Sequence, residues 1–142
     1  MELILWRHAD AEPGPDDMAR RLTPAGEKQA AAMAKWLRAH LPREYTLLAS
    51  PAVRAQQTAA ALGRPITEKA LAPGASPKDI RHAVENYEGL VIVVGHQPDL
   101  GRVAAKLVAD LREEWSVEKG AIWWLEGKEP ARIKAVVSPD LL

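Results

Sequence analysis

The sequence contains no cysteine and carries no excess of charge of either sign. Without cysteine, the chain has no disulfide, no thiol nucleophile and no thiolate ligand for a metal. Its 19 basic residues balance its 19 acidic residues, so it lacks the broad basic field that attracts nucleic acid. No apolar run approaches the ~20 residues that span a bilayer, and the first residues lack the pattern of a signal peptide. These absences predict a cytoplasmic protein that binds neither nucleic acid nor membrane.

The composition is that of a folded domain. Hydrophobic residues make up 47% of the 142 positions, which is enough for a sizeable core. No repeat, low-complexity segment or long linker divides the chain. We therefore expect residues 1–142 to form a single domain.

Hydrophobic patterning alternates between strand and helix along most of the chain. Short apolar runs predict strands at Leu3–Trp6, Tyr45–Ala49, around Ile66, and at Leu90–Val94, the last central and buried on both faces. Helical spacing predicts helices over Pro24–Leu41, Pro51–Leu62, Pro77–Tyr87 and Pro98–Leu111, the first three with a Ser or Thr cap before the proline. Two final strands, Ala121–Leu125 and Arg132–Val137, form a hairpin around Gly127. This order predicts a three-layer α/β/α domain with a mainly parallel sheet and a C-terminal antiparallel hairpin.

Three of the expected parallel strands end in residues that bind anions. Arg7 and His8 follow the first strand, Arg54 lies one helical turn beyond the second, and His96 follows the central strand. Because the carboxyl ends of parallel strands share one edge of a sheet, these side chains should converge. Two helices begin at that edge, and their free N–H groups favour an anion. Arginine forks suit phosphoryl oxygens, and a histidine can act as nucleophile or proton carrier.

These motifs resemble the histidine phosphatase superfamily, which includes the phosphoglycerate mutases. Arg7-His8-Ala9 matches the family's Arg-His-Gly motif, and the segment Ser50–Thr58 matches its Ser-Pro-x-x-Arg-Ala-x-Gln-Thr motif. Gly95-His96 matches a later Gly/Ser-His motif, and Arg21–Gly26 is similar to the family's loop and helix start. The matches cover most of the chain and stand in the family's order.

The resemblance implies a mechanism. By it, His8 is the nucleophile that becomes phosphohistidine, and Arg7, Arg54 and His96 bind the phosphoryl oxygens, with Gln97 offering its backbone N–H. No metal or cofactor is implied. The interval between the second and the central strand is short, which resembles the compact branch of bacterial phosphohistidine phosphatases, whose pocket no inserted helices cover.

The sequence departs from the family pattern at two places. Ala9 replaces the motif glycine, which would restrict the turn if a positive φ were required there. The stretch Leu71–Ala75, where many members carry a glutamate as general acid, has no carboxylate. Asp10 and Glu68 remain candidate acids. A missing acid favours phosphohistidine as substrate, because its leaving imidazole takes a proton on its other nitrogen.

Three functions remain open at this stage. The leading hypothesis is a metal-independent phosphatase that removes phosphate from phosphohistidine of a protein. The second is a phosphomonoesterase of the same family that acts on a small molecule such as a sugar phosphate or a nucleotide. The third is a phosphate-binding module without turnover, which two histidines beside two arginines disfavour. Arg20 and Arg21 are interpreted as solvated loop charges, and the sequence identifies neither the partner protein nor the oligomeric state.

Overall fold

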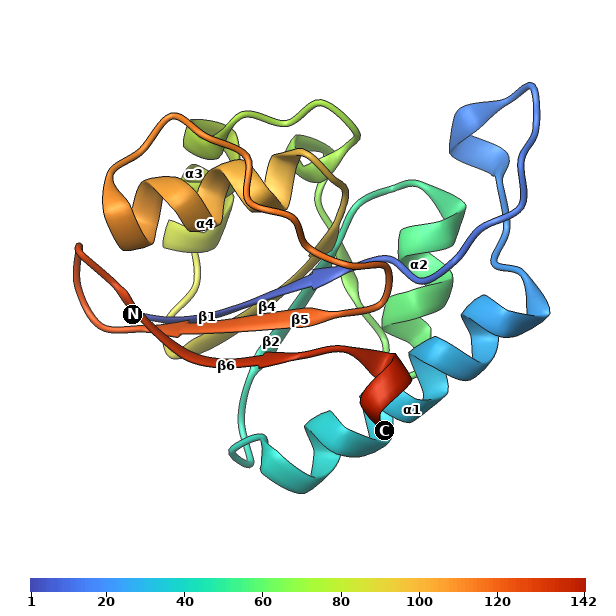
Figure 1. Ribbon diagram of the computed structural model, residues 1–142, viewed down its shortest axis with the longest axis horizontal. Coiled ribbons are helices and arrows are strands. Elements are labelled where there is room, and N and C mark those ends of the chain that lie inside the picture. The colour runs from blue at the N-terminus through green and yellow to red at the C-terminus, as the bar shows by residue number, and fades with distance from the viewer.

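A six-stranded sheet forms the centre of the computed structural model, which covers residues 1–142 (Figure 1). Its strands are β1 (Glu2–Arg7), β2 (Thr46–Ala49), β3 (Ile66–Thr67), β4 (Leu90–Gly95), β5 (Ile122–Glu126) and β6 (Arg132–Val137). They lie in the order β3-β2-β4-β1-β5-β6. The first four are parallel, and β5 and β6 add an antiparallel pair beside β1. The predicted sheet and terminal hairpin are confirmed.

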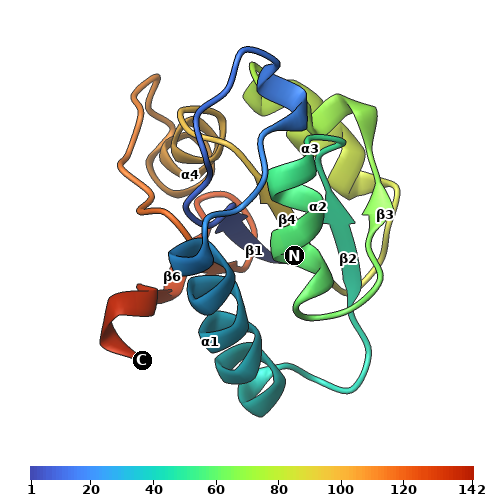
Figure 2. The ribbon, with the colours of Figure 1, turned by 90° about the vertical axis from the view of Figure 1, so that its right-hand side faces the viewer.

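Helices cover both faces of the sheet and complete the three predicted layers (Figures 1 and 2). The helices are α1 (Pro24–His40), α2 (Val53–Ala60), α3 (Pro77–Glu85) and α4 (Asp99–Ala109). Short 3-10 turns lie at Asp17–Ala19, Lys69–Leu71 and Pro139–Leu141. One core cluster joins α1 and α2 to one face of the sheet, and a second joins α3 and α4 to the other. None of the helices has the length and the apolar character needed to cross a membrane.

Strand β4 fixes where the parallel strands end. All six of its residues are buried, and it lies between β2 and β1 as the sequence predicts. Arg7 at the end of β1 pairs with Gly95 at the end of β4, and Ala49 of β2 pairs with Val94. The three carboxyl ends are therefore level, and the residues that follow them start from neighbouring positions.

The helix starts agree with the sequence pattern at two of three places. Thr23 and Ser76 each accept a backbone N–H of the first turn, as predicted. The prediction that Ser50 caps α2 is wrong, because α2 begins at Val53 and Ala52 stands at its N-cap. The Ser50 hydroxyl instead accepts the N–H of Ala52 in the turn before the helix. The hydroxyl therefore lies at the edge of the sheet, where it contacts His96.

Gly26 lets α1 approach the segment that follows β1. A Cβ at this position would lie 2.0 Å from the carbonyl oxygen of Asp10. Backbone cannot yield to such an overlap without moving α1 or the Asp10 segment. The glycine is thus required by close packing next to His8.

We expect Gly26→Ala to lower the free energy of unfolding by about 1–3 kcal/mol, the usual cost of an overpacked site. The matched control is Gly63→Ala, because nothing lies within 4 Å of a Cβ there. That control should stay within about 0.5 kcal/mol of wild type. Urea unfolding measures both variants, and equal stabilities would contradict the close approach at Gly26.

Candidate active site

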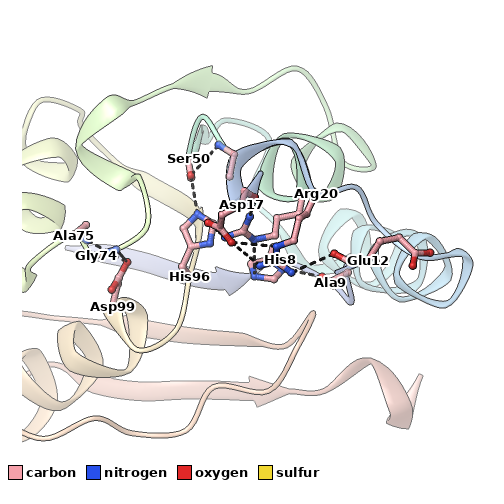
Figure 3. A network of polar contacts seen from close by, with 12 residues as sticks. His8, Ala9, Glu12, Asp17, Arg20, Ser50, Gly74, Ala75, His96 and Asp99 are labelled. Atoms are coloured by element: carbon pink, nitrogen blue, oxygen red, sulfur yellow. Dashed lines mark hydrogen bonds and ion pairs between the residues drawn. The ribbon is translucent and has the colours of Figure 1, made fainter. Parts of the chain in front are cut away.

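The structure brings both sequence-predicted histidines and both arginines to the carboxyl edge of the sheet. His8 follows β1 and His96 follows β4, and their ring centroids lie 5.2 Å apart (Figure 3). Arg54, from the first turn of α2, donates its Nε–H to Nε2 of His8 at 3.3 Å. His8, Arg54 and His96 are all buried.

Backbone contacts assign the tautomer of His8. Its Nδ1 lies 2.7 Å from the carbonyl oxygen of Ala9, which can only accept a hydrogen bond, so we place the proton on Nδ1. Nε2 then carries the lone pair and accepts the Nε–H of Arg54. The nitrogen that faces the arginine is therefore the nucleophilic one.

His8 is neutral at physiological pH. Burial lowers the pKa of its imidazole to about 4, although the hydrogen bond to Ala9 opposes this shift. Nearby positive charges lower that pKa further, and they come from Arg54, Arg7 and Arg20. The imidazole thus keeps a free lone pair in a strongly cationic surrounding, as a nitrogen nucleophile requires.

His96 is also neutral and is held by Ser50. Burial lowers the pKa of His96 to about 3, and repulsion from His8, once that ring is protonated, and from Arg54 acts in the same direction. Its Nε2 lies 2.8 Å from the Ser50 hydroxyl. Its Nδ1 is buried and has no hydrogen-bond partner. Sequence reasoning missed this role of Ser50, although the residue stands in the quoted Ser-Pro motif.

Arg54 is held on its other side by the loop between β1 and α1. Its Nη1 donates to the backbone carbonyl of Asp17 at 2.6 Å, and its Nη2 donates to Asp17 Oδ2 at 3.1 Å. Arg20 donates to the second carboxylate oxygen, Oδ1, from Nε at 3.1 Å and Nη2 at 3.0 Å. No sequence pattern indicates these contacts, because the loop has no hydrophobic periodicity. Arg20 is therefore not a solvated charge but part of the site's surroundings.

Arg7 extends from the end of β1 towards the connection between α4 and β5. Its Nη1 donates to the carbonyl of Val117 at 2.9 Å. Burial lowers the pKa of Arg7, and the charge on Glu118 opposes that shift. The guanidinium stays charged, and its Nε is buried without a hydrogen-bond partner.

Ala9 fits the turn after His8 without strain. The only non-glycine residue with a positive φ is Asp110, so the motif position does not require glycine here. The methyl group of Ala9 is buried against Leu22 and Ala30. Its N–H donates to the Thr58 hydroxyl at 3.0 Å, which ties the turn to α2.

Similarity to known proteins agrees with this geometry. A family model described as histidine phosphatase superfamily (branch 1) matches residues 3–72. A phosphohistidine phosphatase SixA homologue from Haemophilus influenzae is 32% identical, over 75% of this chain and 77% of that protein. The chain belongs to the histidine phosphatase superfamily.

Two further relatives agree with that membership. An uncharacterised protein of Mycobacterium tuberculosis is 36% identical, over 72% of this chain and 70% of its own length. The structure of the protein histidine phosphatase SixA complexed with tungstate has a TM-score of 0.84, covers 99% of both chains and is 22% identical. At 22% identity, the similarity to this SixA structure shows that the two chains share a fold.

Neither candidate acid of this histidine phosphatase is free. Asp10 accepts Lys119 Nζ at 2.9 Å and the Thr23 hydroxyl at 2.8 Å. The hydrogen bond from Lys119 is the largest of the effects that lower the pKa of Asp10, so this carboxyl is ionised at neutral pH. Glu68 accepts the hydroxyl of Tyr87 at 2.7 Å.

The side chain of Gln97 lies in a structural contact. Its Nε2 donates to the carbonyl of Trp115 at 2.9 Å, and its Oε1 accepts the N–H of Gly101 at 2.9 Å. The amide therefore joins α4 to the connection that follows it. Only the backbone of Gln97 is left for the anion-binding role expected from the sequence. No group of three or more His, Asp or Glu side chains is arranged to hold a metal ion.

We expect the two neutral histidines to make stability depend on pH. Their pKa values of about 4 and about 3 lie below the ordinary histidine value of 6.5, so the unfolded chain binds protons first as the pH falls. Above pH 6.5 the two histidines should cost the folded protein no stability relative to the unfolded chain, and the free energy of unfolding should reach its highest value with respect to them. It should fall below that pH by up to about 1.4 kcal/mol per pH unit for each histidine.

Urea unfolding between about pH 7.5 and 5 measures this slope. His8→Asn and His96→Asn should each reduce it, and His82→Asn, on the exposed side of α3, should leave it unchanged. Identical slopes in all four proteins would contradict the burial of neutral imidazoles.

Proposed function

We propose that this histidine phosphatase transfers a phosphoryl group to Nε2 of His8 and then hydrolyses the phosphohistidine, and that its substrate is phosphohistidine of a protein. The observation that carries the proposal is the neutral His8, whose Nε2 lone pair faces the Arg54 guanidinium at 3.3 Å. A phosphate-binding module needs the cations, but it does not need a nucleophile prepared in this way.

The first step is an attack of Nε2 of His8 on phosphorus. The N–P bond of the substrate breaks as the new N–P bond forms, and the leaving imidazole takes a proton on its other nitrogen. The N–H of Arg54 that His8 accepts in the free protein passes to a phosphoryl oxygen. Buried Nδ1 of His96 and Nε of Arg7 lack partners, and phosphoryl oxygens would provide them.

The second step returns the nucleophile. Water attacks phosphorus, the bond to Nε2 of His8 breaks, and inorganic phosphate leaves. Throughout, the hydrogen bond from Nδ1 to the Ala9 carbonyl holds the ring in place and stabilises the charge it gains. Arginines that neutralise the phosphoryl oxygens can supply the stabilisation that metal ions supply elsewhere, so we propose a metal-independent reaction.

The state of the carboxylates supports phosphohistidine over an ordinary phosphate ester. Asp10 and Asp17 have lowered pKa values, with Asp10 bound to Lys119 and Asp17 bound to Arg54 and Arg20, so neither holds a proton to give to an alkoxide. Phosphohistidine does not need that proton. The name of the Haemophilus influenzae relative agrees with this substrate. A small phosphorylated molecule remains the alternative, and it requires a leaving group of comparable quality.

We expect brief mixing with a 32P-labelled phosphohistidine protein to give a phosphoenzyme that is labile in acid and stable in alkali. His8→Ala should give neither phosphoenzyme nor turnover, since no other nucleophile faces Arg54. His82→Ala, which changes an exposed histidine on α3, is the control and should behave as wild type. The assays contain a strong chelator. Turnover by His8→Ala, or a rate that requires added magnesium, would overturn the proposal.

We also expect the rate to depend steeply on the leaving group. Phosphohistidine and nitrophenyl phosphate should be cleaved far faster than alkyl phosphates, because no carboxylic acid protonates the departing oxygen. Asp10→Asn and Glu68→Gln should each cost much less than the roughly 10²–10⁴-fold of a lost general acid. The measurement is kcat/KM across esters of graded leaving-group pKa. A flat dependence that becomes steep in either variant would identify that residue as the acid and favour the small-molecule alternative.

A further inference from the structure

The loop between β1 and α1 binds Arg54 through the carboxylate of Asp17. Asp17 lies in a three-residue 3-10 turn, and its carboxylate accepts hydrogen bonds from Arg54 and from Arg20. Figure 3 shows Asp17 and Arg20 close to His8 and His96. The backbone carbonyl of Asp17 holds a further nitrogen of Arg54. Asp17 thus offers Arg54 two oxygen acceptors, one of them charged, and a phosphoryl group binds an arginine fork through a similar pair of oxygens.

A phosphoryl group would have to compete with this loop for Arg54, because each nitrogen of the guanidinium already donates a hydrogen bond. Nε faces His8, while Nη1 and Nη2 both donate to Asp17. A phosphoryl group bound beside His8 would stand next to the carboxylate on one guanidinium. Two anions on one guanidinium repel each other, so the carboxylate and the phosphoryl group disfavour each other there.

The loop rather than the arginine is free to move. The Arg54 side chain is 4% exposed and is anchored in α2, whereas the Asp17 side chain is 58% exposed. No residue of the Asp17–Ala19 turn is buried, and segments with few buried contacts open at low cost. His8, Arg54 and His96 are themselves buried beneath their neighbours.

We propose that Asp17 is an internal competitor of the phosphoryl group, and that substrate displaces its carboxylate from Arg54 to open the site. This inference rests on the proposed function in taking Arg54 as a ligand of the transferred phosphoryl group. It adds a lid whose closed state is held by charge.

The test is the affinity for inorganic phosphate, measured by calorimetry and as the inhibition constant against nitrophenyl phosphate. Asp17→Asn keeps the shape of the side chain and removes its charge. It should bind phosphate about three- to tenfold more tightly, the factor that corresponds to the net free energy of one ordinary protein hydrogen bond. The KM should fall by a similar factor without a fall in kcat.

Asp16→Asn is the matched control, because it removes the same charge from the neighbouring position, which contacts neither arginine through its side chain. Its phosphate affinity should remain within about twofold of wild type, whereas an equal gain would show a general effect of charge and would overturn the proposal. An Asp17→Asn protein that binds phosphate no more tightly, or that loses kcat, would also overturn it. The second result would assign to Asp17 a role in positioning Arg54. Asp17→Ala repeats the measurement without any side-chain acceptor, and urea unfolding confirms that each variant is folded.

The two proposals fail in different ways. Tighter phosphate binding by Asp17→Asn without a phosphoenzyme in any variant would keep the lid and overturn the phosphatase mechanism. A trapped phosphoenzyme on His8 together with unchanged phosphate affinity would keep the mechanism and overturn the lid.

Discussion

Basic side chains lie at one edge of a sheet, with His8, Arg54 and His96 buried and Arg7 partly buried, and this is the constraint on which the site depends. A buried charge without a partner is strongly destabilising, and the protein meets this cost differently for each group. The two imidazoles are neutral, with pKa values of about 4 and about 3. Arg7 donates to a backbone carbonyl, and Arg54 donates to Asp17. The lone pair of His8 and the carboxylate on Arg54 are thus two consequences of the same constraint.

The scaffold converts this electrostatic arrangement into fixed geometry. Strand pairing makes the ends of β1, β2 and β4 level, so that the residues after them start from neighbouring positions. The Thr58 hydroxyl accepts the N–H of Ala9 and donates to the carbonyl of Arg54. That single side chain therefore links the turn that carries His8 to the helix that carries Arg54. Gly26 brings α1 against the same turn, and the nucleophile is held from two sides.

The sequence predicts what depends on local pattern and misses what depends on distance in the fold. The strands, the helices and the meeting of His8, Arg54 and His96 follow from strand ends and from parallel order. The Ser-Pro pair predicts a helix cap at Ser50, whereas the contact of Ser50 with His96 depends on how β2 lies beside β4. Local sequence makes Asp10 a candidate acid, because its partner Lys119 lies far along the chain. Asp17 lies in a loop without periodicity, so no pattern indicated its contact with Arg54.

An internal carboxylate on Arg54 acts on the substrate and on the product alike. Competition from Asp17 weakens the binding of both, because both bind the same guanidinium. A loss that is equal in the ground state and the transition state raises KM and leaves kcat unchanged. When phosphate leaves, the carboxylate replaces it on a cation that would otherwise remain buried and unpaired. The chemical steps on His8 are untouched by this exchange, so the carboxylate sets how strongly the site holds an anion and not how fast the bound substrate reacts.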